Sequence, residues 1–286
     1  MVSQSKKKRY TNMKKLLLAA AAIAGAAVMA TGATACSNSN TIYVDTNAYF
    51  APFEYYDEDM NIAGVDVDIM NLVGEKLNKK VVFQNTDFDV IIDNVSSGKK
   101  YDCGAAGITI TEERQEKVAF SNPYFTSVQY VIFQTGAITS DGTSTDGASI
   151  EYVLWSSLAG KKIGVQRDTT GDIYANDEID SEKGELHNTN ASVTSYDNAQ
   201  LAVDAIGAKQ VDVVIVDKLP AEYIVKNNTG YQCYALYYDA ATATEEQYAI
   251  CVTKGNDELL NAINEVLAEL GTEGINNLVS QHLGLN

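Results

Sequence analysis

Residues 211–217 read VDVVIVD, and this stretch decides the fold class. Residues with branched Cβ atoms run through it with one interruption, Asp212, before the closing Asp217. Such a run is typical of a strand covered on both faces. An amphipathic segment at 198–207 precedes it, and a short apolar segment at 162–165 lies before that. A strand, a helix and a second strand in this order predict an α/β domain with a mixed or parallel sheet.

The same alternation extends over the chain from residue 41 onward. We expect strands at 42–44, 81–83, 103–107, 128–133 and 248–252, and helices at 67–77, 90–95, 258–270 and 275–282. The polar, Gly-rich segment GAITSDGTSTDG at 136–147 has no periodicity and indicates a boundary. We therefore predict two α/β lobes joined by two crossing strands, one lobe formed by residues 41–134 and 244–286 and the other, inserted into it, by residues 135–243.

The first 35 residues have the pattern of an export signal. Six basic residues, with no acid among them, precede an apolar Leu/Ala run at 16–30, which is shorter than the ~20 residues needed to span a bilayer. Ala33-Thr34-Ala35 then leads to Cys36, as at the acylated cysteine of bacterial lipoproteins. We expect a signal peptide at 1–35, a lipid anchor on Cys36 and a tether at 36–40, which would place the protein outside the cytoplasm on the cell membrane. Because Ala33 stands where lipoproteins usually carry leucine, simple secretion is the alternative; a buried helix is the other interpretation of the apolar run.

The net charge excludes one class of partner. The chain has 38 acidic and 21 basic side chains, a net charge of −17, and without the six basic residues of the signal the net charge is −23. Binding to nucleic acid needs a basic surface that neutralises phosphates. We therefore expect no nucleic-acid partner.

The residues of common catalytic and metal sites are absent or badly spaced. The two histidines, His187 and His282, have no plausible catalytic partner nearby in sequence, and no glycine-rich phosphate loop is present. Residues 57–68 resemble a calcium loop only in part, because Ile62 stands where that loop needs glycine, so a solvated turn is favoured. We expect no enzyme activity, no cofactor and no metal. Cys103, Cys233 and Cys251 lie in apolar runs and are expected to be buried thiols, although one pair could still bridge.

Nine segments, in order, carry a resemblance to a known family. The chain resembles the family 3 extracellular solute-binding proteins, the polar amino-acid receptors of ABC importers, in TNAYFAPFEY (46–55), GVDVD (64–68), TDFD (86–89), GITITEER (107–114), AFSNPY (119–124), LAGKKIGVQ (158–166), TTG (169–171), VDVVIVD (211–217) and YAI (248–250). The resemblance implies a two-lobed fold of the periplasmic-binding-protein type (type II) with two hinge strands. It also implies a monomer that takes a free amino acid as ligand and ABC permease subunits as partners.

Two charged residues suit the main-chain groups of an amino acid. A planar guanidinium binds a carboxylate through two hydrogen bonds, and Arg114 follows a Thr-x-Thr strand exit where Thr109 and nearby amides can help. Asp217 ends the most apolar strand, where ligands of open α/β sheets bind, and suits the ammonium group. The alternatives are a solvated helix charge for Arg114 and a helix N-cap for Asp217.

The resemblance implies the rest of the site. Phe50 and Phe88 would flank the ligand side chain, Ala106 and Gly107 would contribute backbone beside Thr109, and Thr169 and Thr170 would close over the carboxylate. Asn47 and Gln166 would contact the side chain or main-chain groups of the ligand. Ordinary core packing of the two phenylalanines and plain N-capping by the threonines are the alternatives. Three positions depart from the family pattern: Asn47 replaces an aspartate seen in several members, Asp168 a frequent glycine and Asp93 a frequent proline.

The amides and aromatic rings favour an uncharged polar ligand such as glutamine. Cationic amino acids come second, because aromatic faces and the negative net charge attract cations. An acidic ligand would need a second basic residue, for which Arg167 is the candidate. An enzyme of the cyclohexadienyl or arogenate dehydratase type on the same scaffold is the alternative function, and a sensor or adhesion module is a third.

Overall fold

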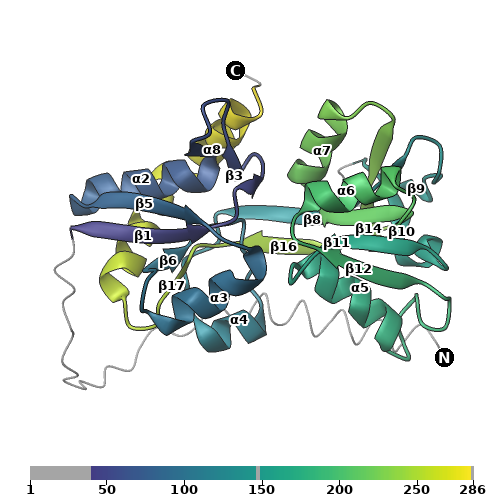
Figure 1. The fold of residues 1–286 in the computed structure, drawn as a ribbon, viewed down its shortest axis with the longest axis horizontal. Helices are drawn as coiled ribbons and strands as arrows, with labels where there is room; N and C mark the ends of the chain where they lie inside the picture. Colours follow the sequence, from purple (N-terminus) through teal and green to yellow (C-terminus); the bar gives the residue numbers. More distant parts are fainter. Residues whose placement is uncertain (1–39, 146–148, 285–286) are drawn as a thin grey trace. The chain divides into compact units, whose positions relative to one another are not determined.

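The computed structural model describes residues 40–145 and 149–284. The predicted signal peptide, Cys36 and most of the tether lie outside these residues. The described chain contains two large sheets, each flanked by helices on both faces, and Figure 1 shows them side by side. We call the part with the five-stranded sheet the first lobe and the part with the nine-stranded sheet the second lobe.

The first lobe is built from both ends of the described chain. Its sheet has the order β5-β1-β6-β17-β7, with β1 parallel to β5 and β6 and with β17 antiparallel to β6 and β7. A separate small sheet, β2-β3-β4, lies beside it. The strands of the first lobe are β1 (Thr41–Thr46), β2 (Tyr49–Phe50), β3 (Glu54–Tyr56), β4 (Ile62–Ala63), β5 (Lys80–Asn85), β6 (Cys103–Gly104), β7 (Ala119–Phe120) and β17 (Cys251–Val252). The helices of this lobe are α2 (Val65–Leu77), α3 (Phe88–Ser97), α4 (Glu112–Lys117) and α8 (Asp257–His282).

The second lobe is a sheet of the order β12-β11-β13-β8-β14-β10-β9, with β15 paired to β14 and β16 paired to β8. Helices α6 and α7 cover one face and α5 the other (Figure 1). The strands are β8 (Phe125–Gln134), β9 (Gly142–Thr143), β10 (Glu151–Leu154), β11 (Lys162–Gln166), β12 (Ser192–Tyr196), β13 (Val213–Asp217), β14 (Tyr231–Asp239), β15 (Thr242–Ala243) and β16 (Glu245–Tyr248), and the helices are η1 (Trp155–Leu158), α5 (Thr170–Asp180), α6 (Ala199–Gly207) and α7 (Lys218–Asn227).

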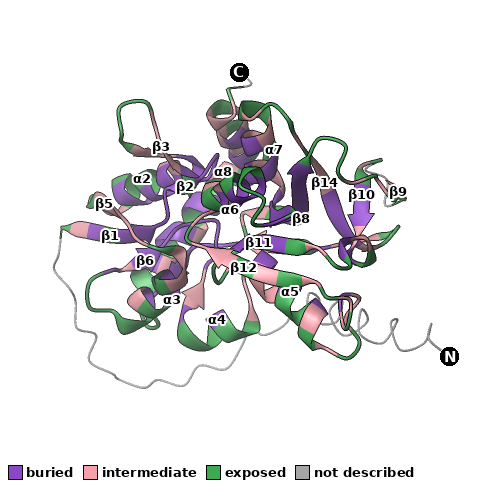
Figure 2. Cartoon of the chain, turned by 45° about the vertical axis from the view of Figure 1, so that its right-hand side comes forward, coloured by how far each residue is buried: buried purple, intermediate pink, exposed green. Residues whose placement is uncertain are grey.

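The apolar run at 211–217 contains the buried strand β13. All five residues of β13 are buried between β11, which is parallel to it, and β8, which is antiparallel. Helix α6 begins at Asn198, whose side chain accepts a hydrogen bond from the Leu201 amide at 2.9 Å, and it buries Ala202, Val203 and Ile206. In Figure 2 the inner strand β8 is mostly purple, whereas α4 is largely green. The core of the second lobe therefore lies along its central strands.

Two antiparallel strands connect the lobes. β8 pairs with β16 from Phe125 to Val128 and with β13 from Gln129 to Phe133. The pairing of β8 with the central strand β13 thus begins at Gln129, before the boundary that the Gly-rich segment suggests after Gln134. The lobe boundaries themselves stay a prediction.

Several expected elements differ in extent. The strand expected at 103–107 ends at Gly104, because Gly107 adopts a left-handed φ of 54° and the chain turns there. The strand expected at 248–252 is two strands, β16 and β17. The two C-terminal helices form one element, α8, which breaks at Gly271, where φ is 57° and ψ is −175°.

The cysteines and the acidic turn have structural roles. Cys103, Cys233 and Cys251 are free thiols. Cys251 lies opposite Gly104 and Cys103 opposite Val252 in antiparallel strands, so the two buried thiols point to opposite faces of the sheet. Asp57 accepts hydrogen bonds from the amides of Asp59 at 3.0 Å and Asn61 at 2.8 Å, as a turn between β3 and β4 requires.

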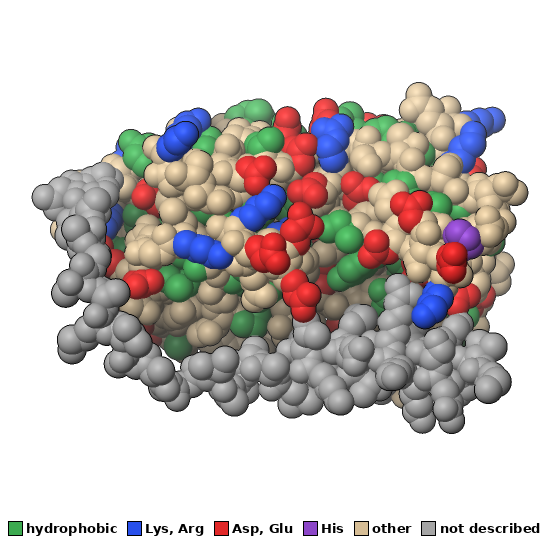
Figure 3. Space-filling model, turned by 90° about the horizontal axis from the view of Figure 1, so that it is seen from below, with side chains coloured by type: hydrophobic (Ala, Val, Ile, Leu, Met, Phe, Trp, Pro, Cys, Tyr) green, Lys and Arg blue, Asp and Glu red, His purple; other side chains and the backbone are tan. Residues whose placement is uncertain are grey.

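No described helix combines the length and apolarity needed to cross a membrane. The surface seen from below carries many acidic side chains with basic ones interspersed (Figure 3). On this described face the basic side chains form no continuous patch.

Candidate functional site

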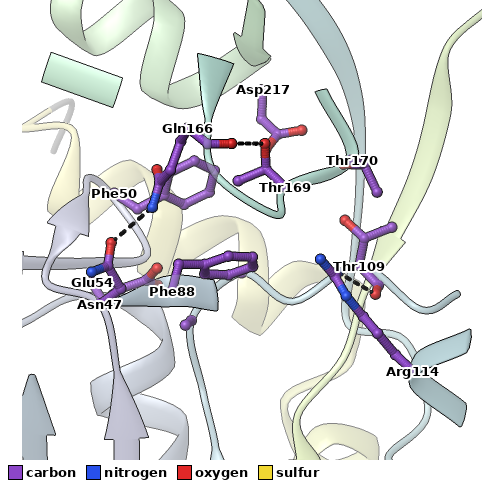
Figure 4. Close-up of a pocket in the computed structure, with 12 residues that line it drawn as sticks. Asn47, Phe50, Glu54, Phe88, Thr109, Arg114, Gln166, Thr169, Thr170 and Asp217 are labelled. Carbon is purple, nitrogen blue, oxygen red and sulfur yellow. Dashed lines mark hydrogen bonds between the residues drawn. The ribbon is translucent and has the colours of Figure 1, made fainter. Parts of the chain in front are cut away.

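A cavity lies between the lobes and brings the predicted ligand-binding residues together (Figure 4). Two hydrogen bonds cross it from one lobe to the other, from Arg114 Nη2 to the Asp168 main-chain oxygen at 2.7 Å and from Gln166 Nε2 to Asn47 Oδ1 at 3.0 Å, so the lobes are closed around it. An amino acid can therefore enter only after the lobes separate. The lining consists of all eleven predicted residues and one more, Glu54: Asn47, Phe50, Glu54, Phe88, Ala106, Gly107, Thr109, Arg114, Gln166, Thr169, Thr170 and Asp217.

Arg114 is a buried cation whose hydrogen bonds are to neutral acceptors. It lies in the first turn of α4, where the Thr111 side chain accepts a hydrogen bond from its amide, and it is 6% exposed. Nη1 donates to the Thr109 main-chain oxygen at 2.9 Å, and Nη2 donates to that of Asp168 in the second lobe at 2.7 Å. Burial lowers the pKa of Arg114, against the opposing charges of Asp168 and Glu246. The interpretation of Arg114 as a solvated helix charge is wrong, and its guanidinium is suited to receive a carboxylate.

Asp217 is a buried carboxylate at the end of β13. It stands at the N-cap position of α7, but its side chain makes no capping hydrogen bond. Its Oδ1 accepts instead from Gln129 Nε2 at 2.6 Å. Burial and the charge of Glu246 raise the pKa of Asp217 well above its usual range. Such a group is stabilised in its ionised form by a cation that enters the cavity.

The two phenylalanines come from different elements of the first lobe. Phe50 lies in β2 and contacts the loop at Gly107, where an added Cβ would lie 2.9 Å from the ring, so only glycine fits. Phe88 begins α3, and the Arg114 guanidinium carbon lies 5.4 Å from its ring centroid. The loop is held by Asp66, which accepts from the Gly107 amide at 2.9 Å. Both rings line the cavity, so neither is only a core residue.

The two amides are paired with each other across the cavity. Gln166 Nε2 donates to Asn47 Oδ1 at 3.0 Å, and Asn47 Nδ2 donates to the Thr86 main-chain oxygen at 2.7 Å (Figure 4). Asn47 is thus satisfied by the protein in this closed form. Gln166 Oε1 is a buried atom with no hydrogen-bond partner in the described residues.

The threonine turn begins α5. Thr169 is the N-cap and accepts from the Asp172 amide at 3.4 Å, while its hydroxyl donates to the Gln166 main-chain oxygen at 2.8 Å. Thr170 donates its hydroxyl hydrogen to Glu246. Asp168, before the turn, has a left-handed φ of 60°, a conformation that glycine adopts most easily, and glycine is frequent at this position in the family. Its carbonyl oxygen lies against Arg114.

Glu54 is the lining residue that the sequence reasoning missed. It is fully buried at the start of β3, opposite Phe50 in the strand register. Neither carboxylate oxygen has a hydrogen-bond partner among the described residues. Burial raises the pKa of Glu54 well above its usual range, and the charges of Asp66 and Asp217 raise it further. The residue stood inside a recognised segment, but nothing in the sequence indicated that its side chain turns inward.

Arg167 does not line the cavity. It is half exposed and forms ion pairs with Asp197 at 3.0 Å and Asp89 at 3.6 Å. Asp93 is likewise on the surface, paired with Lys117 at 3.0 Å. The second basic residue that an acidic ligand would need is therefore not found among the described lining residues.

Known proteins are similar to this chain over most of its length. The chain is 30% identical over 273 residues to a probable histidine-binding protein of Neisseria gonorrhoeae, with 92% of each protein covered. It is 26% identical over 268 residues to the lysine/arginine/ornithine-binding periplasmic protein of Escherichia coli K12, covering 92% of this chain and 94% of that protein. A solved structure of an ancestral arginine-binding protein bound to glutamine has a TM-score of 0.70 at 32% identity and covers 86% of this chain and 98% of its own.

The relatives named here are binding proteins, and the structural relative confirms the two-lobed α/β fold. Residues 42–284 match a single family along the whole described length of both lobes. The chain belongs to the bacterial extracellular solute-binding proteins, family 3.

Proposed function

We propose that this protein captures a free amino acid between its lobes and delivers it to the permease of an ABC importer. The observation that carries the proposal is the pair of buried, opposite charges in one cavity, Arg114 from the first lobe and Asp217 from the second. A zwitterion offers a carboxylate to the first and an ammonium to the second. Because the two anchors lie on different lobes, the ligand favours closure, and a closed receptor is the form that a permease can distinguish from the empty one.

The proposal includes the location of the protein. The expected export signal and the acylated Cys36 would hold it as a monomer at the outer face of the cell membrane, next to its permease. The tether at 36–40 would leave the lobes free to open. These expectations concern residues outside the described part of the chain and rest on the sequence.

For the ligand side chain, we propose a cationic amino acid, with glutamine as the alternative. The expectation of a glutamine-like ligand relied on the amides of Asn47 and Gln166, which are hydrogen-bonded to each other in the closed form. Of the buried lining oxygens without a partner among the described residues, one belongs to the Gln166 amide and two to the Glu54 carboxylate. A guanidinium or ammonium group would supply both the charge and the donors that this carboxylate lacks.

The balance of buried charges supports the same choice. Glu54 and Asp217 contribute two carboxylates to the lining, and Arg114 contributes one cation. A ligand with two positive groups and one carboxylate neutralises this set, whereas a glutamine leaves one buried carboxyl without a cation. The names of the two curated relatives, which bind histidine and lysine, arginine and ornithine, support a cationic ligand, and the glutamine bound to the ancestral arginine-binding protein supports the alternative.

Calorimetric titration of the purified protein with arginine, lysine, histidine, glutamine and glutamate tests the proposal. We expect arginine, lysine or histidine in its protonated form to bind most tightly and glutamate to bind worst. A protein that binds none of the five would contradict the receptor function. Tightest binding by glutamine would keep the receptor function and overturn the cationic assignment. Parallel incubation with arogenate and prephenate should give no aromatic product; turnover would instead favour the dehydratase-type enzyme.

A further inference from the structure

Glu246 is a buried carboxylate that stands behind the cavity rather than in its lining. It belongs to β16, one of the two strands between the lobes, and is 4% exposed. Thr109 and Thr170, which do line the cavity, lie between it and the cavity. Figure 4 shows these two threonines on the same side of the cavity as Arg114.

One oxygen of Glu246 takes the hydroxyl hydrogens of both threonines. Thr109 Oγ1 donates to Oε2 at 2.7 Å, and Thr170 Oγ1 donates to the same oxygen at 2.5 Å. The other oxygen, Oε1, accepts from Gln129 Nε2 at 2.5 Å, and the same nitrogen donates to Asp217. Each threonine hydroxyl has a single hydrogen, so after this donation only oxygen lone pairs are left. Thr170 Oγ1 also accepts from Gln129 Nε2 at 3.3 Å, which leaves this oxygen one lone pair for the cavity.

We propose that Glu246 is a positioning residue for the ligand's ammonium group. By fixing the hydroxyls of Thr109 and Thr170 as hydrogen-bond acceptors, it makes the space at these two hydroxyls a site for a donor cation and not for a carboxylate; Gln129 links the same Glu246 to Asp217. The threonine hydroxyls therefore do not bind the ligand carboxylate, the role that the sequence suggested for them; that role belongs to Arg114 and to main-chain amides. This inference rests on the proposed amino-acid receptor function.

The same contacts link the ammonium site to closure. Thr109 belongs to the first lobe and Thr170 to the second, so their hydroxyls reach one carboxylate oxygen only when the lobes meet. An open form keeps at most one of the two hydrogen bonds. The acceptor pair is thus assembled by closure, on a residue of the hinge.

The test compares Glu246→Gln with a matched control, Glu245→Gln. Both variants remove one negative charge from β16, but Glu245 is exposed. Each is titrated with arginine, with its deamino analogue 5-guanidinopentanoate, which lacks the ammonium group, and with agmatine, which lacks the carboxylate; glutamine and its deamino analogue are run in parallel. In Glu246→Gln the threonine hydroxyls are no longer fixed as acceptors for the ligand's ammonium group, so arginine and agmatine should bind about tenfold or more weakly. 5-Guanidinopentanoate has no ammonium group and should stay within about twofold of its wild-type affinity.

Glu245→Gln should leave all the affinities unchanged. An equal loss for arginine and its deamino analogue would overturn the proposal, because it would mean that Glu246 acts only on the fold or on closure. If Glu246→Gln does not fold, Thr170→Val provides the same comparison, since it removes one of the two acceptors and keeps the side-chain shape. A wild type that binds neither arginine nor glutamine would contradict the receptor function itself, and the role of Glu246 with it.

Discussion

The Arg114 guanidinium reaches across the cavity and donates a hydrogen bond to the main-chain oxygen of Asp168 at 2.7 Å. The donor belongs to the first lobe and the acceptor to the second. The acceptor is available because Asp168 adopts a left-handed backbone conformation, with φ of 60°. The residue assigned to the ligand carboxylate is therefore also a direct contact between the closed lobes.

Arg114→Ala should weaken amino-acid binding by about 2–5 kcal/mol, because a desolvated charged partner of the carboxylate is lost. Arg114→Lys should recover only part of the loss, since an ammonium cannot form the two parallel hydrogen bonds of a guanidinium. Calorimetric titration measures both. Near wild-type affinity in Arg114→Ala would show that the carboxylate binds elsewhere.

Asp217→Asn should change binding and stability in opposite directions. The substitution removes the anion that we assign to the ligand's ammonium, so affinity should fall by about 2–5 kcal/mol. The ligand-free protein should become more stable, because burial holds the pKa of Asp217 high and its ionised form is costly at neutral pH. Thermal unfolding without ligand checks the second effect. A lower melting temperature in Asp217→Asn would indicate that the carboxylate is needed by the fold.

Glu54→Gln should change specificity. Affinity for cationic amino acids should fall by about 10–100-fold, while affinity for glutamine should stay the same or rise. Glu58→Gln is the matched control, since Glu58 carries the same charge on the exposed turn after β3. An unchanged ratio of arginine to glutamine affinity in Glu54→Gln would remove Glu54 from the ligand side-chain site.

The same variant has a predictable pH dependence. The pKa of Glu54 is raised in the folded protein, so its contribution to stability is fully present below the pKa of the unfolded chain and is lost as the pH rises through the folded pKa. The free energy of unfolding of Glu54→Gln, relative to the wild type, should therefore increase with pH above about 4.3, the usual pKa of a glutamate. Denaturant titrations at several pH values without ligand measure this difference, and a constant difference would show that Glu54 titrates normally.

Asp168→Gly should stabilise the ligand-free protein by up to about 1 kcal/mol, because glycine adopts a left-handed φ without the steric cost of a Cβ. The main-chain oxygen that accepts from Arg114 is retained, so ligand affinity should stay within about threefold of the wild type. Chemical denaturation and titration check the two parts. A large loss of affinity would mean that the Asp168 carboxylate, and not only its backbone, serves the site.

Cys36→Ser should release the protein from the membrane fraction, since the acyl chains would have no attachment site. Cys233→Ser is the control, because Cys233 is a free thiol within the folded part of the chain. Fractionation after a high-salt wash separates lipid anchoring from charge attraction. If Cys36→Ser still sediments with membranes, the lipid anchor is the wrong assignment.

Ten of the eleven predicted lining residues lie in the recognised segments and Ala106 directly precedes one; the turn at 169–171 and the strand end at 217 also have local signatures. Glu54 and Glu246 could not be predicted in the same way. Glu246 lies between Glu245 and Gln247, and Glu54 between Phe53 and Tyr55. Their surroundings come from residues far away in the sequence: Thr109 and Thr170 for Glu246, and the cavity lining for Glu54. The local sequence indicates where a strand lies, but it does not indicate which charged side chains of that strand the rest of the fold buries.

The position of β17 bears on the order in which the two lobes can be completed as the chain emerges. Its residues, Cys251 and Val252, fill the gap between β6 and β7 in the first sheet, and α8 then packs on α2, with Lys76 bonded to Glu265 and Glu269 at 3.0 and 2.8 Å. The second sheet, in contrast, uses only residues 125–248. Every strand of the second lobe is therefore available once residue 248 has emerged, whereas the first lobe, although it starts first, is complete only after β17 and α8 have followed.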